Sequence, residues 1–198
     1  MKWNKSTIWA FVILLVTASL YRTWEGRPFG LAPQMAMALF GGAVIKDKRL
    51  ALLLPLLSLL VSDALYQVLY INGLSTIKGF YEGQWLTYIL FVGITFFGML
   101  MKKINLKNVV GFSISGSLIF FLLSNFGVWA GTGGLERPKT FNGLMLCYGD
   151  ALAFYRDHGV INGFYGNQLI GDLFFCFLLF GMYALAKNYL MRPAVKAA

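Results

Sequence analysis

The chain has 198 residues, of which 58% are hydrophobic and only 13% are charged. Soluble domains carry about 25% charged residues, so a chain this apolar could not cover its surface in water, and we expect it to lie in lipid. A net charge of +9 could suit nucleic acid, but most basic residues fall in short segments on one side of the membrane, which is not a nucleic-acid footprint.

The predicted elements follow from the apolar runs, because a helix needs about 20 apolar residues to cross a bilayer. Six transmembrane helices are predicted, at 7–22, 32–45, 50–71, 85–101, 109–129 and 166–190. The first could instead be a signal peptide. We favour a retained helix because the bulky segment 21–24 does not resemble a cleavage site. The fold class is therefore an all-α membrane protein, with residues 1–198 in one transmembrane domain.

The connections between these helices differ in charge and length. Eleven of the 17 Lys and Arg residues lie in the predicted inner segments, and short loops rich in such residues stay in the cytoplasm. We therefore expect both termini to be cytoplasmic, in a bacterial inner membrane whose anionic lipids attract the basic residues. The longest outer loop, at about 130–165, lies between helices 5 and 6 and is predicted to fold back with a short helix near 142–156.

Two carboxylates fall inside predicted spans, Asp63 in the third and Asp172 in the sixth. An ionisable side chain there costs roughly 2.5–3.5 kcal/mol on insertion scales, so function is the default hypothesis. From a rise of about 1.5 Å per residue, Asp63 is expected about 20 Å above the inner surface and Asp172 about 9 Å below the outer one. The two acids are therefore predicted to meet at similar depth.

Other polar and aromatic residues are predicted at the same level, on several helices. An aromatic cavity with a few aimed polar groups is how small-molecule pockets are built. The predicted substrate-binding residues are Asp63, Tyr66, Gln67, Tyr88, Asn125, Trp129, Gln168 and Asp172. The alternative is that the two acids are capped by hydroxyls and amides and only fix helix packing, since polar contacts between membrane helices contribute about 0.6 kcal/mol on average.

One side of the second predicted helix carries small residues in place of bulky side chains, at Ala32, Ala36, Gly41 and Gly42. Such residues let membrane helices approach closely. They predict either packing within the chain or docking of a partner protein.

The sequence offers no pattern for catalysis or for a cofactor. It has no Ser/His/Asp arrangement, phosphate-binding loop or His-rich motif. One histidine and two cysteines without Cys-x-x-Cys spacing make a metal site improbable. We therefore expect a protein that is not an enzyme and binds no metal.

Several segments resemble, in sequence and in their order along the chain, those of a family of small bacterial membrane proteins regarded as transport proteins. They include PLLSLLVSD at 55–63 and SNFGVW at 124–129, with further matches at 32–33, 38–43, 138–140, 143–144, 147–148 and 171–172. In size, helix number and topology, the chain also resembles the substrate-binding S components of energy-coupling-factor transporters. This second resemblance is an analogy of fold.

The resemblance implies an S-component-like bundle with an outward-facing site for a scarce small nutrient. In such transporters a transmembrane coupling subunit with two ATPases drives release of the nutrient inside. S components usually dock through Ala-x-x-x-Ala on helix 1, whereas here that pattern stands at Ala32 and Ala36 on helix 2. A solitary transporter therefore stays open, as does a non-enzymatic structural or accessory subunit of a larger membrane complex. The leading hypothesis is a substrate-binding component for nutrient uptake.

Overall fold

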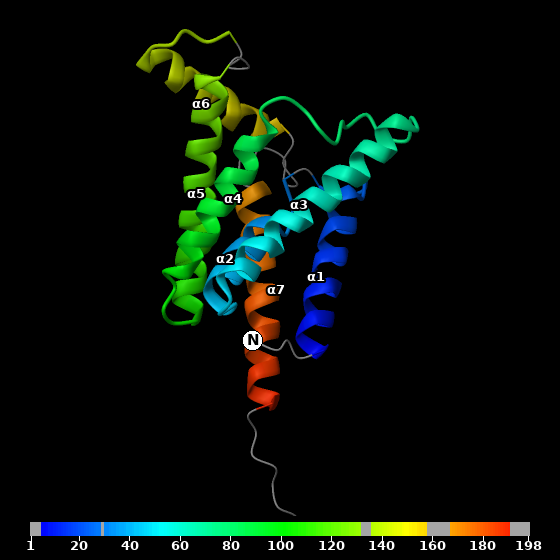
Figure 1. Ribbon diagram of the computed structural model, residues 1–198. Coiled ribbons are helices and arrows are strands. Elements are labelled where there is room, and N and C mark those ends of the chain that lie inside the picture. The colour runs from blue at the N-terminus through cyan, green and yellow to red at the C-terminus, as the bar shows by residue number, and fades with distance from the viewer. Residues whose placement is uncertain (1–4, 29, 132–135, 158–166, 191–198) are drawn as a thin grey trace, which may run out of the picture.

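The computed structural model describes residues 5–28, 30–131, 136–157 and 167–190, in which every regular element is an α-helix (Figure 1). The helices are α1 (Lys5–Thr23), α2 (Gln34–Val44), α3 (Lys48–Ile71), α4 (Gln84–Met99), α5 (Leu106–Ala130), α6 (Phe141–Asp157) and α7 (Asn167–Leu190). All six helices predicted from the apolar runs are present, with bounds within three residues of the prediction. The short helix predicted in the long loop is also confirmed, as α6.

The helices other than α6 alternate in direction along the chain. In Figure 1, α1, α3 and α5 run upward, and α2, α4 and α7 run downward. The start of α1 and the end of α7 therefore lie at the same end of the bundle, opposite to α6. This up-and-down arrangement is what short connections between neighbouring helices produce.

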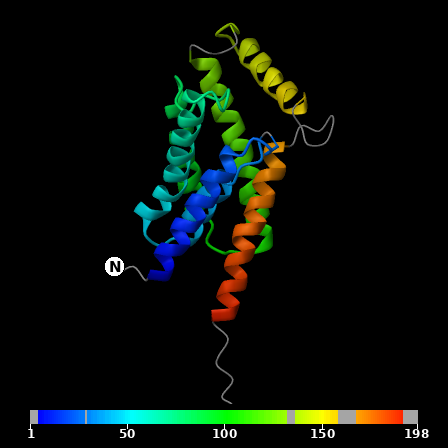
Figure 2. The same ribbon diagram turned by 90° about the vertical axis from the view of Figure 1, so that its right-hand side faces the viewer.

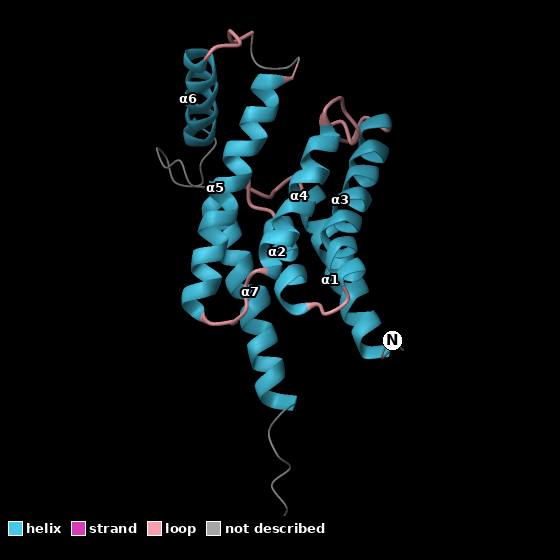
Figure 3. Cartoon of the chain, turned by 60° about the vertical axis from the view of Figure 1, so that its left-hand side comes forward, coloured by secondary structure: helices cyan, strands magenta, loops and turns pink. Residues whose placement is uncertain are grey.

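The short helix α2 lies at the centre of the bundle. It contacts α3, α4, α5 and α7, and Figure 3 shows it between α1 and α3 on one side and α5 on the other. Residues Met35 to Leu39 are almost fully buried. With 11 residues, the helix rises only about 16 Å, much less than the roughly 30 Å of a bilayer core.

Local sequence signals explain where two of the longer helices begin. The Asp47 carboxylate accepts hydrogen bonds from the backbone N–H of Arg49 (3.0 Å) and Leu50 (3.4 Å) at the start of α3. The Asn105 side chain accepts one from the N–H of Asn108 (2.8 Å) at the start of α5. Both are N-caps that satisfy backbone donors left open in the first helical turn.

Three of the described helices, α3, α5 and α7, are long and apolar enough to cross a membrane, and α1, α2 and α4 are shorter apolar helices. Large apolar side chains are exposed along α1, α5 and α7, among them Trp9, Ile13, Leu118, Phe174 and Met182. Exposed apolar surface of this extent is unfavourable in water and suits lipid chains. The protein is therefore an all-helical membrane protein.

Candidate functional site: a buried ion pair shared by three helices

The Asp63 carboxylate lies at the centre of a polar cluster that joins α1, α3 and α4. Only 2% of Asp63 is exposed. Its Oδ1 accepts a hydrogen bond from Nη1 of Arg22, and its Oδ2 accepts from Nε2 of Gln84 (2.5 Å) and from the hydroxyl of Tyr88 (2.6 Å). Both carboxylate oxygens thus have charged or polar partners, as a buried charge requires.

Arg22 neutralises Asp63 from the last turn of α1. Its Nη1 also donates to the Ser62 hydroxyl at 2.5 Å, and its guanidinium carbon lies 5.6 Å from the centroid of the Tyr66 ring. An aromatic ring at this distance attracts a guanidinium electrostatically. The Arg22 side chain is 21% exposed, so the cation reaches the molecular surface while Asp63 does not.

Gln84, in the first turn of α4, connects this cluster to the α3–α4 loop. Its Nε2 donates to the Gly79 carbonyl (3.0 Å) as well as to Asp63, and its Oε1 accepts from the N–H of Tyr81 (3.3 Å). The Gln67 Oε1 accepts from the N–H of Phe80 (3.2 Å). The loop is thus fixed against α3 beside Asp63.

Gly79 allows this close approach of the loop to α3. A Cβ added there would lie 2.7 Å from the Cβ of Gln67 and would also collide with backbone of α3. Distances below 3.0 Å are essentially never found for real Cβ atoms. A side chain at this position would push the loop away from the cluster.

The carbonyl end of α1 is satisfied by two side chains from other parts of the chain. The Tyr66 hydroxyl donates to the Arg22 carbonyl at 2.5 Å, and Nε of Arg27 donates to the same oxygen at 3.2 Å. Arg27 Nη1 also donates to the Leu31 carbonyl (3.0 Å). Because the last carbonyls of a helix have no partners within it, these bonds fix the end of α1 and hold the Arg27 side chain at the Arg22 carbonyl.

Asp172 has different partners from Asp63. It is 2% exposed, and its Oδ2 accepts a hydrogen bond from the Ser117 hydroxyl of α5 at 2.6 Å. In the part of the chain that the structure describes, no polar side chain bonds to both carboxylates. Asp63 therefore joins α3 to α1 and α4, whereas Asp172 joins α7 to α5.

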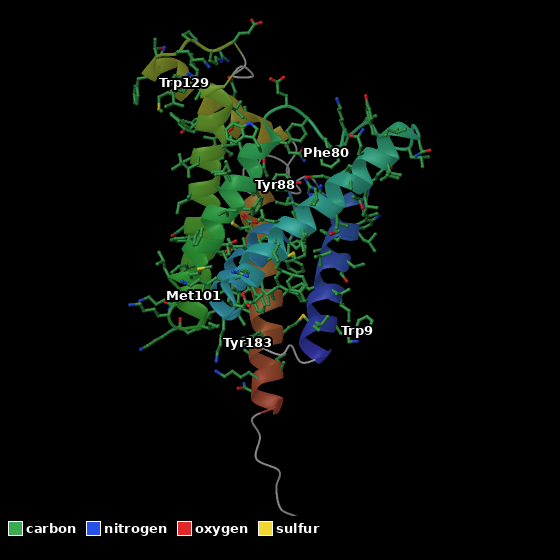
Figure 4. The ribbon with its side chains drawn as sticks, viewed as in Figure 1. Trp9, Phe80, Tyr88, Met101, Trp129 and Tyr183 are labelled. Atoms are coloured by element: carbon green, nitrogen blue, oxygen red, sulfur yellow. The ribbon has the colours of Figure 1, made fainter. Side chains whose placement is uncertain are left out.

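The other predicted substrate-binding residues lie in three places: the Asp63 cluster, the C-terminal end of α5 and the first turn of α7. Tyr66, Gln67 and Tyr88 lie at the cluster. Asn125 donates to the Phe121 carbonyl of its own helix (2.8 Å), and Figure 4 places Trp129 well apart from Tyr88. Gln168 lies in the first turn of α7. The structure thus brings together four of the eight residues, at Asp63.

The small residues of α2 pack within the chain. Ala36 is fully buried, and Ala32 is partly buried. A Cβ on Gly41 would lie 2.8 Å from the Ala51 carbonyl of α3, and one on Gly42 would lie 2.8 Å from the Met99 nitrogen of α4. Gly41 and Gly42 therefore stand where α2 approaches α3 and α4, and docking of a partner stays a prediction.

The segment at 136–157, which contains α6, is bound to α5 by hydrogen bonds. The Tyr148 hydroxyl donates to the Leu122 carbonyl (3.0 Å), and the Trp129 indole N–H donates to the Pro138 carbonyl (2.9 Å). Arg137 makes two hydrogen bonds to Asp150, at 2.8 and 2.9 Å, which raise the pKa of this guanidinium. Figure 2 shows α6 on the side of α5 and α7, away from α1 and α3.

Sequence reasoning missed Arg22, Ser62 and Gln84 as members of the cluster. A signal for Arg22 was present, because α1 and α3 run in the same direction. Arg22 stands 17 residues after the start of α1 and Asp63 stands 15 after the start of α3. At a rise of about 1.5 Å per residue, the two opposite charges differ in height by only about 3 Å.

The described residues contain no group of three or more His, Cys, Asp or Glu side chains that could hold a metal ion. The chemistry of the cluster is instead that of hydrogen-bond donors around one carboxylate, with an arginine at its edge. Such an arrangement can orient a bound molecule but holds no activated nucleophile.

Fold and cluster together define an all-helical membrane protein with an ion pair between α1 and α3 inside a polar cluster shared with α4. Within this class, the chain belongs to the family DUF6580, a family of unknown function, whose model matches residues 2–195. No curated protein and no solved structure matches the chain.

Proposed function

We propose that this protein is a non-enzymatic binding component that captures a small solute at the outer side of a bacterial inner membrane for uptake. In this proposal six helices cross the membrane, both termini are cytoplasmic, and the Asp63 cluster lies toward the outer side with α6. The positive-inside distribution of Lys and Arg supports this orientation.

The observation that carries the proposal is the Arg22–Asp63 ion pair. Replacing a buried ion pair by apolar residues of similar size is often neutral or stabilising, so a need for stability gives little reason to keep one. Each charge is also costly to place in a membrane. A pair with one partner buried and the other 21% exposed is well suited to recognising a polar solute.

The surroundings of the pair also support solute binding. Tyr88 and Gln67 are partly exposed and supply an aromatic ring and an amide. Tyr66, Ser62 and Gln84 are buried and hold Arg22 and Asp63 in position. Small-molecule sites commonly combine aromatic surface with a few fixed polar groups. These side chains are held in place before any solute arrives.

Capture of solutes from a mixed metabolite extract tests this function. The full-length protein in lipid nanodiscs is incubated with the extract, washed and analysed by mass spectrometry for retained small molecules. We expect the wild type and Arg137→Gln, altered in the outer segment, to retain the same solute. Arg22→Gln should retain at least tenfold less, since hydrogen bonds to charged groups contribute about 1.5–3 kcal/mol.

Two results would contradict the proposal. One is a wild-type protein that retains no solute, and the other is equal retention by wild type and a folded Arg22→Gln variant.

Purification from native membranes separates coupled uptake from an accessory role. A stoichiometric membrane partner without ATPase subunits would favour an accessory subunit of a larger complex, whereas ATPases would support coupled uptake.

A further inference from the structure

We infer that the captured solute carries an oxyanion, such as a carboxylate or phosphate, which binds the open edge of the Arg22 guanidinium beside Arg27. This inference rests on the proposed function and names the chemical class of the solute. The two buried carboxylates by themselves would favour a ligand with a protonated nitrogen. The contacts of Arg22 favour a negatively charged ligand instead.

The open edge of Arg22 consists of Nε and Nη2. Both hydrogen bonds that the guanidinium donates, to Asp63 and to Ser62, come from Nη1. Guanidinium has five N–H donors, so three stay without a partner among the residues described. The Arg22 side chain is 21% exposed, and neither Nε nor Nη2 is among the described buried polar atoms that lack a partner. We therefore assign these N–H groups as the part of the guanidinium that is open to a ligand.

This edge has the geometry that binds an oxyanion. Nε and Nη2 present parallel N–H groups in one plane, which match the two oxygens of a carboxylate or phosphate. Because Nη1 is held by Asp63 and Ser62 while the Tyr66 ring lies against the guanidinium, the plane of the fork is fixed in advance. Such preorganisation lowers the entropy cost of binding.

The pairing of charges also favours an anion. Within the described residues Arg22 pairs with one carboxylate, Asp63. Arg27 donates only to backbone carbonyls, and in that part of the chain no carboxylate, including those of Glu25 and Glu82 in the neighbouring loops, forms an ion pair with it.

A cationic ligand fits less well because Asp63 is out of its reach. The carboxylate is 2% exposed and already accepts three hydrogen bonds, from Arg22, Gln84 and Tyr88. A solute arriving from outside would meet the guanidinium first. A positively charged group there would be repelled by both Arg22 and Arg27.

Thermal unfolding with three probes of the same shape tests the inference. The full-length protein in nanodiscs is heated with benzoate, benzamide or benzylamine at equal concentrations, and with inorganic phosphate. We expect benzoate or phosphate to raise the unfolding midpoint of the wild type and of Arg137→Gln, and the two other probes to leave it unchanged. The benzoate or phosphate response should weaken in Arg22→Lys, which keeps the charge but loses the fork, and disappear in Arg22→Gln.

A second variant covers the possibility that Arg22→Gln alone fails to fold. Arg22→Gln with Asp63→Asn replaces the ion pair by a neutral amide pair, so no charge is left buried without its partner. This double variant should fold and show no response to benzoate or phosphate. An undiminished response in a folded double variant would overturn the inference.

Other outcomes separate the inference from the function on which it rests. Equal stabilisation by benzamide or benzylamine would overturn the oxyanion class and leave solute capture standing.

Because a lipid headgroup also offers an oxyanion, native mass spectra in phosphatidylglycerol and phosphatidylcholine nanodiscs form a separate experiment. Arg22-dependent retention of lipid without any response to benzoate or phosphate would confirm the oxyanion and contradict the solute. No response and no retained lipid would overturn both.

Discussion

At the scale of single residues, Asp63 depends on partners from two other helices. Removing its carboxylate leaves the Arg22 charge, the Gln84 amide and the Tyr88 hydroxyl without their acceptor. Asp63→Ala should lower the free energy of unfolding by about 3 kcal/mol, at the low end of the range for buried pairs because Arg22 is 21% exposed. Reversible denaturant unfolding in mixed micelles, followed by circular dichroism, measures this loss.

A double variant and a surface control separate pairing from general damage. Asp63→Leu with Arg22→Met leaves no charge unpaired but still removes the acceptor of Gln84 and Tyr88, so its unfolding free energy should recover only about half of the loss. Asp150→Ala breaks the more exposed Arg137 pair and should change stability by about 1 kcal/mol or less. If Asp63→Ala behaves like Asp150→Ala, the ion pair does not hold these helices together.

The sequence predicted the polar residues of the cluster only in part. It identified Asp63, Tyr66, Gln67 and Tyr88, because buried polar groups stand out in apolar helices. It also grouped Asp172 with Asp63 from their similar height. Height follows from the rise per residue, but the direction a side chain faces depends on which helices surround it. The central position of α2 leaves Asp63 facing α1 and α4, and Asp172 facing α5.

At the scale of helices, the contact between α2 and α3 depends on a glycine and a proline. Pro55 has no N–H, so it leaves the Ala51 carbonyl without its usual helical donor. That carbonyl lies against Gly41, where an added Cβ would be 2.8 Å away. The glycine of α2 and the proline of α3 thus act together to bring the two helices close.

Gly42 gives a sharp test of this packing. A Cβ at Gly42 would meet the backbone of α4, which cannot move aside cheaply. Gly42→Ala should therefore lower the free energy of unfolding by about 1–3 kcal/mol. Gly93 of α4 is the matched control, because nothing lies within 4 Å of its added Cβ. Gly93→Ala should leave stability unchanged or raise it by up to about 1 kcal/mol, and equal losses in both variants would contradict close packing of α2.

The attachment of α6 to α5 depends on few contacts and should loosen separately. Tyr148→Phe removes the hydrogen bond to the Leu122 carbonyl, which contributes about 1 kcal/mol. Hydrogen exchange measured by mass spectrometry should become several-fold faster in α6 and stay unchanged in α3. Tyr70→Phe, at an exposed position of α3, is the control. Unchanged exchange in α6 would show that this bond does not hold it.

Helix bounds were predictable to within three residues from hydropathy and length, and the N-caps Asp47 and Asn105 set the starts of α3 and α5. The apolar runs predicted all six helices, and the long loop was predicted to contain the short helix that is α6. The contacts of α6 were not predictable in the same way. They depend on α5, where backbone carbonyls accept the Tyr148 and Cys147 side chains.

At the scale of the whole molecule, the proposed orientation can be tested with cysteines. Cys147 and Cys176 are buried, so both are first replaced by alanine. Thr76→Cys in the α3–α4 connection and Lys103→Cys in the α4–α5 connection then lie at opposite ends of the bundle (Figure 1). In intact cells a membrane-impermeant maleimide should label Thr76→Cys and spare Lys103→Cys until the membrane is opened. The reverse pattern would place the Asp63 cluster on the cytoplasmic side.

A structure of the protein in complex with the solute that it retains would show which residues bind the solute. We predict that an oxyanion of the solute lies within hydrogen-bonding distance of Nε and Nη2 of Arg22, with Asp63 still bound to Nη1, Gln84 and Tyr88. A solute bound elsewhere, for example between α5 and α7 at Asp172, would contradict the claim that the Arg22–Asp63 cluster is the binding site.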